Sequence, residues 1–102
     1  MEKYTYNKMT DIKKELFKAT RYEDEATVKV KVYYSNEGEI TYDVEVNVYI
    51  DGEYIDGWIN DTFYEGGEEQ AMKRAKAVLK TVKGWFKGDD EVTVEDNVEY
   101  YG

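Results

Sequence analysis

Residues 26–64 read ATVKVKVYYSNEGEITYDVEVNVYIDGEYIDGWINDTFY, and this stretch decides the fold. Apolar and polar residues alternate from Ala26 to Tyr34 and again from Ile40 to Ile50, the two-residue period of strands that bury one face. Between these runs, Asn36-Glu37-Gly38 is typical of a three-residue hairpin loop whose glycine takes a left-handed conformation. The sequence therefore predicts two antiparallel strands joined by a short hairpin.

The loop also predicts the register of this hairpin. Val30 is expected opposite Val44, so that apolar side chains meet on one face. Lys31 is expected opposite Asp43, so that opposite charges meet on the other face. A slip of one residue would destroy both matches, because it turns every side chain to the opposite face.

A third strand follows the second one directly. Asp51-Gly52 predicts a two-residue type I′ turn, because both of its central positions need positive φ. The strand then runs from Glu53 to Asn60 and is expected to continue to residue 64 with a bend or bulge. Its buried face is expected to carry Ile55 and Ile59, and its outer face Tyr54, Asp56 and Trp58.

Two amphipathic helices flank this meander. Residues 11–20 form the first, with Thr10 as its N-cap, and Glu68 to Phe86 form the second. The predicted fold class is α+β with the order α-β-β-β-α, in which both helices cover the apolar face of a three-stranded antiparallel sheet. Residues 91–95 are expected to add a short edge strand, and residues 96–102 a mobile acidic tail.

The 102 residues fit a single domain. Its expected parts are an N-terminal segment (1–9), the α-β-β-β-α core (10–87) and an acidic C-terminal segment (88–102). The sequence has no cysteine and no histidine. A disulfide framework, a thiol nucleophile and a histidine base are thereby excluded. No apolar run approaches the length of a membrane span or signal-peptide core. We therefore expect a cytoplasmic protein, located in the host cytoplasm if a phage encodes it.

The net charge of −9 is unevenly distributed. Residues 22–67 hold twelve acidic residues against two lysines, and residues 88–102 hold six acidic residues and no base. The second predicted helix is basic instead. An acidic sheet repels nucleic acid and membrane surfaces and attracts basic clefts of other proteins.

Catalytic and metal chemistry is not indicated. Carboxylate pairs are frequent, but no pattern places two of them in the different environments that acid–base catalysis needs. The spacing of Asp51, Asp56 and Asp61 lacks the ligand pattern of a calcium loop. Gly66-Gly67 precedes Glu68 and Glu69, which would repel a phosphate. We predict no enzyme, no metal and no cofactor, and we interpret the lysines of the second helix as a solvated face.

The outer face of the sheet is the best candidate site. Large aromatic side chains lie there among carboxylates, and such aromatics are common anchors of protein interfaces. The alternatives are aromatic pairing that only stabilises the sheet, or cover by the C-terminal segment. With the hairpin tips included, the candidate partner-binding residues are Glu37, Glu39, Asp43, Glu45, Tyr49, Asp51, Glu53, Tyr54, Asp56 and Trp58.

The predicted order of elements resembles that of the double-stranded-RNA-binding domain over residues 10–86. The segment Gly66-Gly67-Glu68-Glu69-Gln70-Ala71-Met72-Lys73 opens the last helix, where that family places paired lysines that hold phosphate. Glu68 and Glu69 invert this charge. The resemblance therefore implies the fold and argues against RNA binding.

A second resemblance is to small acidic phage-encoded inhibitors, notably anti-CRISPR proteins that imitate nucleic acid. It rests on the size, the absence of cysteine, the acid-rich sheet and the acidic hairpins Asn36-Glu37-Gly38-Glu39 and Asp51-Gly52-Glu53. It implies a stoichiometric inhibitor that occupies the basic groove of a partner such as a Cas effector. The alternative is a structural protein that forms homo-oligomers through the aromatic face. Either a monomer or a homodimer fits the sequence.

Overall fold

A computed structural model describes residues 9–20 and 25–102 and shows an α+β fold in the predicted order. The first helix begins at Met9, so Thr10 lies within its first turn and not before it. The prediction for residues 1–8 falls outside the described residues. The elements are α1 (Met9–Thr20), β1 (Ala26–Glu37), β2 (Glu39–Ile50), β3 (Glu53–Tyr64), α2 (Glu68–Trp85), β4 (Val92–Val94) and β5 (Glu99–Tyr101).

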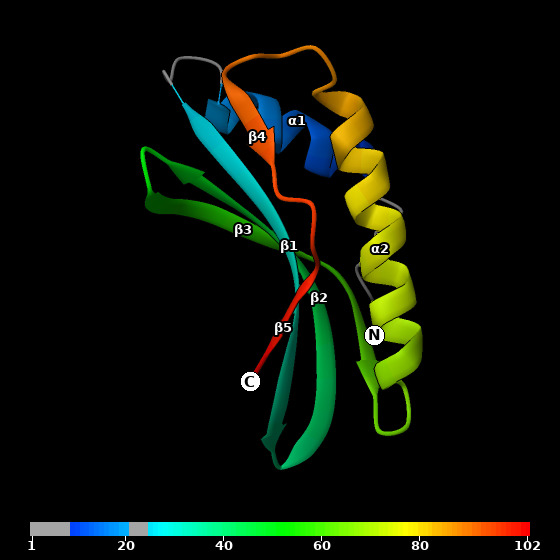
Figure 1. Ribbon diagram of the computed structural model, residues 1–102. Coiled ribbons are helices and arrows are strands. Elements are labelled where there is room, and N and C mark those ends of the chain that lie inside the picture. The colour runs from blue at the N-terminus through cyan, green and yellow to red at the C-terminus, as the bar shows by residue number, and fades with distance from the viewer. Residues whose placement is uncertain (1–8, 21–24) are drawn as a thin grey trace.

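The sheet has five strands in the order β3-β2-β1-β4, and β5 pairs with β1 beyond β4 (Figure 1). The three long strands are antiparallel, whereas β4 and β5 lie parallel to β1 along the same edge. The short edge strand expected near residue 92 is therefore confirmed. The prediction that residues 96–102 form a mobile tail is wrong, because Glu99–Tyr101 pairs with Lys31–Tyr33.

The β1–β2 hairpin has the predicted faces but a different register. Val30 lies opposite Val46, and Lys31 lies opposite Glu45, two residues from the predicted partners. The turn is centred on Gly38, with φ +88°, one position later than predicted. Because the shift is an even number of residues, the apolar residues still meet on one face.

Two bulges in β3 change its faces. The turn into this strand has positive φ at Asp51 and Gly52, as predicted. Irregularities then follow where β3 pairs with Val48/Tyr49 and with Val44/Glu45. The first leaves Ile55 without a partner on β2, and this extra residue inverts the alternation that follows.

The predicted faces of β3 are consequently wrong at four positions. Asp56, expected on the outer face, lies opposite the buried Val48. Trp58 lies opposite Val46 and packs, half-buried, against the core, so it is not on the outer face. Ile55 and Ile59, expected to be buried, are 47% and 46% exposed. The two-residue alternation of the sequence could not predict these positions. One inserted residue in a bulge moves every later side chain of the strand to the opposite face of the sheet.

Both helices cover the same face of the sheet. The ring of Phe17 on α1 lies 4.9 Å from that of Phe86, which follows α2. At the second bulge, Asp61 lies on the core side and forms an ion pair of 3.4 Å with Arg74 of α2. The buried apolar residues are Ile12, Leu16, Ala26, Val28, Val30, Val32, Val44, Val46, Val48, Ile50, Ala71, Ala75, Val78, Leu79, Val82 and Phe86.

Within the described residues, neither helix has the length and apolar character needed to cross a membrane.

Candidate partner-binding site

The outer face of the sheet, opposite the helices, gathers four tyrosines around two lysines, Lys29 and Lys31. Strand alternation places Tyr33 and Lys31 there from β1, and Tyr49 from β2. Tyr54 of β3 and Tyr101 of β5 join them, because they lie opposite Tyr49 and Tyr33. We call Lys31 and these four tyrosines the tyrosine face.

The tyrosine rings pair across the strands. Tyr33 and Tyr101 have ring centroids 5.0 Å apart, and Tyr49 and Tyr54 form an edge-to-face pair at 5.7 Å. Such pairs stabilise a sheet by about 0.5–1.5 kcal/mol each beyond their buried area. Aromatic pairing and cover by the C-terminal segment, the two alternatives to a binding role, are therefore both present. Tyr54 still remains 57% exposed.

Lys31 neutralises the centre of the tyrosine face. Its side chain is only 14% exposed, and its Nζ donates to the Tyr49 hydroxyl at 2.9 Å. The same ammonium lies 5.1 Å from the Tyr101 ring centroid and 4.0 Å from the Glu99 carboxylate. The centre of the tyrosine face therefore carries less negative charge than the sequence suggested. Its lysine already has a hydrogen-bond partner, Tyr49, and a nearby carboxylate, Glu99.

Glu45 is the hydrogen-bond acceptor beside this lysine. Its Oε1 accepts from the Tyr101 hydroxyl at 3.0 Å and from Asn47 Nδ2 at 3.4 Å. Partial burial, then the charge of Glu45 and its hydrogen bond, raise the pKa of the Tyr101 phenol well above its usual value. The pKa of Tyr54 is also raised, first by burial and then by the charges of Asp56 and Glu45.

Asp43 and Asp56 have local partners. Asp43 Oδ1 accepts from the Thr62 hydroxyl at 2.8 Å, across the β2–β3 pair. Asp56 is exposed, and its Oδ1 accepts from the backbone N–H of Gly57 at 2.8 Å.

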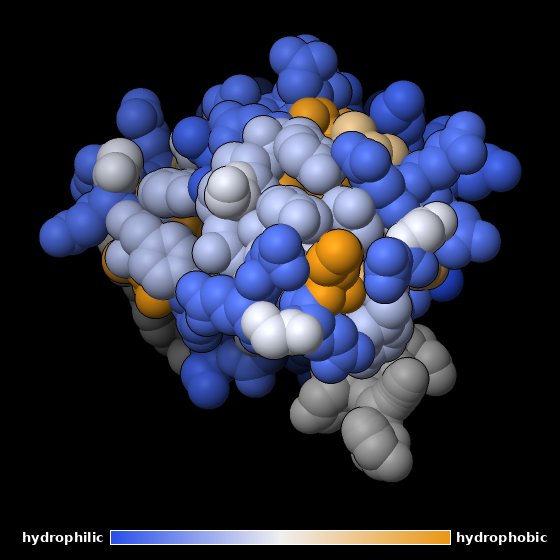
Figure 2. All heavy atoms as spheres, turned by 90° about the horizontal axis from the view of Figure 1, so that it is seen from below, coloured by the Kyte–Doolittle hydropathy of each residue, from blue (hydrophilic) through white to orange (hydrophobic). Residues whose placement is uncertain are grey.

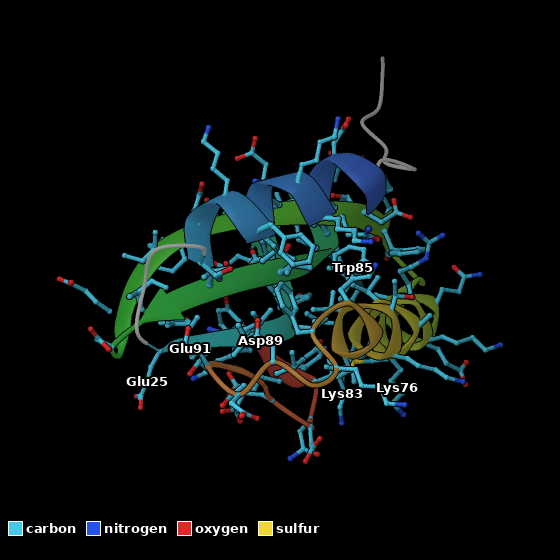
Figure 3. The ribbon with its side chains drawn as sticks, turned by 90° about the horizontal axis from the view of Figure 1, so that it is seen from above. Glu25, Lys76, Lys83, Trp85, Asp89 and Glu91 are labelled. Carbon is cyan, nitrogen blue, oxygen red and sulfur yellow. The ribbon has the colours of Figure 1, made fainter. Side chains whose placement is uncertain are left out.

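One end of the molecule carries the β2–β3 turn with Asp51 and Glu53, both exposed. Backbone hydrogen bonds bring more acids there. The Asp51 N–H donates to the Glu25 carbonyl at 3.2 Å, and the Ala26 N–H donates to the Glu91 carbonyl at 2.9 Å. Glu25, Asp89 and Glu91 lie near one another at this end (Figure 3).

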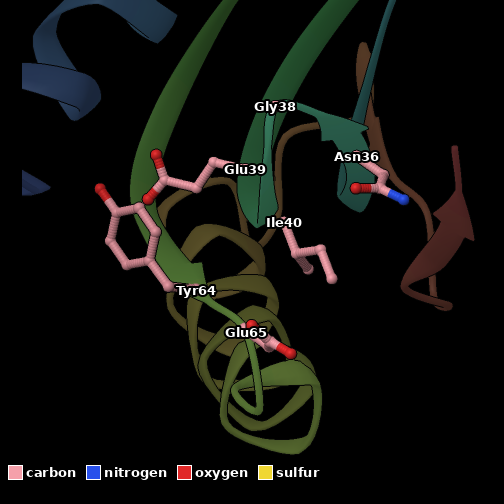
Figure 4. Close-up of a pocket in the computed structure, with 6 residues that line it drawn as sticks. All are labelled: Asn36, Gly38, Glu39, Ile40, Tyr64 and Glu65. Carbon is pink, nitrogen blue, oxygen red and sulfur yellow. The ribbon is translucent and has the colours of Figure 1, made fainter.

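The opposite end carries Glu37 and Glu39 at the β1–β2 turn, next to the β3–α2 loop. An open hollow of about 350 Å³ lies between them, lined by Asn36, Gly38, Glu39, Ile40, Tyr64 and Glu65 (Figure 4). Its lining holds two carboxylates and no base. Seen from this end, the surface is largely hydrophilic with isolated apolar spots (Figure 2).

A smaller hollow of about 140 Å³ opens over β2 and β3, lined by Glu45, Asn47, Tyr54, Gly57, Trp58 and Ile59. The absence of a side chain at residue 57 leaves room for the Asn47 amide and the Tyr54 hydroxyl at the edge of this hollow. A Cβ at this position would lie 2.0 Å from Asn47 Oδ1 and 2.7 Å from the Tyr54 hydroxyl oxygen. We call this space the Gly57 hollow.

The basic side chains of α2 are partly committed to ion pairs. Arg74 pairs with Asp61, and Lys83 pairs with Asp96, whose pKa is lowered by that hydrogen bond and charge. Lys76 and Lys83 lie on the helix layer (Figure 3). The charge of the molecule is therefore divided between a basic helix and acidic sheet ends.

The structure thus divides the ten predicted residues into separate groups. Asp43, Glu45, Tyr49 and Tyr54 share the outer face, Glu37 and Glu39 mark one end, and Asp51 and Glu53 mark the other. Asp56 is exposed beside the first bulge, and Trp58 packs against the core.

Residues that the sequence prediction missed are Lys31, Asn47, Gly57 and Tyr101. The alternation of β1 does predict Lys31 on the outer face, but as the partner of an acidic residue and not as a site residue. Tyr101 could not be placed, because its position depends on a parallel pairing that leaves no local signal.

No group of residues suited to a metal ion occurs in ranges 9–20 and 25–102. Comparison of the chain with protein-family models, curated proteins and solved structures finds no match.

Proposed function

We propose that this protein is a stoichiometric binding protein that occupies a basic, nucleic-acid-binding groove of a partner protein. The observation that supports this best is the pair of acidic hairpin ends. Glu37 and Glu39 lie at one end of the long strands, and Asp51 and Glu53 at the other, all exposed. The molecule is 40 Å long.

The physical basis is competition with phosphate. A carboxylate, like a phosphate oxygen, accepts charge-assisted hydrogen bonds from arginine and lysine. Paired strands hold these carboxylates in place, so that less conformational entropy is lost on binding. The long dimension of the molecule, 40 Å, is comparable with one turn of duplex DNA, which is about 34 Å. One such protein can therefore contact distant parts of a groove.

The sharpest form of the proposal is an inhibitor of a Cas effector. Such a protein holds its nucleic acids in a positively charged channel, which an acidic protein can fill. This form rests on the resemblance to anti-CRISPR inhibitors and on the acidic ends, and the experiment below includes it.

Capture from a bacterial lysate containing Cas effectors, treated with nucleases, tests the proposal. The tagged protein should retain a nucleic-acid-binding protein at low salt and release it at high salt, as mass spectrometry would show. The double variant Glu37→Lys/Glu39→Lys should reduce capture at least tenfold. The control Asp11→Lys/Glu15→Lys on α1 makes the same change in net charge and should leave capture nearly intact. Equal loss in both variants would leave only a nonspecific charge effect and would reject the proposal.

Self-association is the second candidate function, and β3 provides the observation for it. Tyr54, Ile55 and Ile59 are 57%, 47% and 46% exposed on this edge strand. Sedimentation equilibrium would decide: a dimer that Tyr54→Ala dissociates favours assembly, and a monomer at all concentrations favours a foreign partner.

A further inference from the structure

The Gly57 hollow contains a buried acceptor that has no donor. Asn47 is only 6% exposed, and its Nδ2 donates to Glu45 Oε1. Since a carboxylate only accepts, this bond fixes the amide and turns Oδ1 toward Gly57. No described residue donates to this Oδ1. Buried side-chain oxygens are usually hydrogen-bonded, so Oδ1 is a position where a ligand donor would be stabilised.

The other polar groups of the hollow are also acceptors or can act as such. The Glu45 carboxylate carries a negative charge, and the Tyr54 hydroxyl reaches the space above Gly57. The lining residues include no lysine or arginine. A ligand for this site must therefore bring several donors and a positive charge.

The size and shape of the Gly57 hollow further restrict which ligand can bind there. The volume of about 140 Å³ is close to that of a cavity of about 150 Å³ that holds one benzene ring. The Tyr54 ring and the exposed Ile59 provide apolar walls. A guanidinium group is planar, carries five N–H donors, binds carboxylates through two parallel hydrogen bonds and stacks on aromatic rings.

We propose that the Gly57 hollow receives one arginine side chain of the partner protein. This inference rests on the proposed function and adds to it the place where a residue of the basic groove is anchored. Arginine is preferred over lysine because a planar guanidinium can donate to Glu45 and to Asn47 Oδ1 from separate N–H groups while it stacks on Tyr54, and an ammonium group cannot stack in the same way.

Two cations lie near this site, and both contact Tyr49. Lys29 lies opposite Asn47, and its Nζ is 4.9 Å from the Tyr49 ring centroid. The second is Lys31. It lies opposite Glu45 in the sheet, but its ammonium bonds to the Tyr49 hydroxyl and lies near Glu99. Neither Tyr49 nor Glu99 lines the hollow. Glu99 offsets the charge of Lys31, and the carboxylates of Asp56 and Glu45 lie close enough to Tyr54 to raise its pKa, so an arginine does not enter a positive site.

The direct test is an NMR titration of the isotope-labelled protein with the peptide acetyl-Gly-Arg-Gly-amide. Saturable shifts should appear at the Gly57 amide and at the side-chain amide of Asn47. The corresponding lysine peptide should bind several-fold more weakly, and the neutral citrulline peptide should not bind measurably. Shifts that never saturate, or equal shifts with citrulline, would overturn the proposal.

Glu45→Gln is the decisive variant. Glutamine keeps an oxygen that can accept from Tyr101, so the fold should persist while the charge is lost. Binding of the arginine peptide should weaken at least fivefold, whereas the control Glu15→Gln on α1 should not change it. Unaltered binding by Glu45→Gln would contradict the proposed site.

The outcomes separate this inference from the proposed function. If a basic partner is captured but Glu45→Gln binds it as well as the original chain, the hollow is not the anchor and the function stands. If the arginine peptide binds at Gly57 but Glu37→Lys/Glu39→Lys captures as well as the original chain, the hollow stands and the proposed function fails.

Discussion

The hydroxyl of Tyr101 joins the last strand to the centre of the sheet through Glu45. Because its folded-state pKa is raised, the protonated phenol contributes stability that is fully present below its unfolded pKa of about 10. This stability is lost as the pH rises through the folded-state pKa.

Above about pH 10, the unfolding free energy of the original protein should therefore fall as the pH rises, and that of Tyr101→Phe should fall less. Urea denaturation at several pH values between neutral and alkaline would measure it. Identical pH dependence in both proteins would show that the Tyr101 phenol is not held in its partly buried place beside Glu45 in solution.

Trp58 and Tyr54 provide a residue-level test of the first bulge. Trp58→Ala should lower the unfolding free energy by about 2 kcal/mol or more, less than the roughly 3–5 kcal/mol of a fully buried ring. Tyr54→Ala should cost about 1 kcal/mol, because the Tyr49 pair is lost from a mostly exposed side chain. Chemical denaturation measures both, and the reverse order would place Trp58 on the outer face.

Residue identities predicted some of these positions and not others. The glycines at 38 and 52 indicated both turns, because each has a positive φ that favours glycine. The inner valines of β1 and β2 followed from alternation. Trp58, Ile55 and Ile59 did not, since the bulge that moves them depends on pairing between strands and not on a local pattern.

At the level of elements, the C-terminal strand has a structural role that its composition conceals. Glu99–Tyr101 is short, exposed and acidic, which made a mobile tail the natural prediction. It is held by parallel pairing to β1, by the Tyr33 ring and by Glu45. These partners lie far away in the sequence, so no window of residues could reveal them.

Removing residues 99–102 should therefore lower the unfolding free energy by about 1 kcal/mol or more. In a domain of this size, each kcal/mol lowers the melting temperature by roughly 4–8 °C. Amide hydrogen exchange at Lys31–Tyr33 should become faster, while β3 is unchanged. Unaltered exchange in β1 would indicate that β5 does not pair in solution.

The third long strand is an edge that resists continuation of the sheet. Its two bulges interrupt the regular spacing of backbone groups, which is a common protection against edge pairing. Its acids Glu53, Asp56 and Asp61 lie in a strand without any lysine or arginine. These charges oppose edge-to-edge pairing of two copies through the backbone of β3.

At the level of the whole molecule, the net charge of −9 has opposite consequences for stability and binding. Salt screens repulsion among the acids, so added sodium chloride should raise the melting temperature. The same salt should weaken binding to a basic groove. Calorimetry and binding titrations over one salt series would show these opposite slopes. A melting temperature that falls with salt would mean that ion pairs outweigh the repulsion.

Displacement of nucleic acid from the captured partner tests the central claim most directly. Fluorescence anisotropy of a labelled oligonucleotide bound to that partner would be followed as this protein is added. We expect one molecule to release one oligonucleotide, and Glu37→Lys/Glu39→Lys to need at least tenfold more protein. If the protein binds the partner while the oligonucleotide stays bound, it does not occupy the nucleic-acid groove, and the proposed function is wrong.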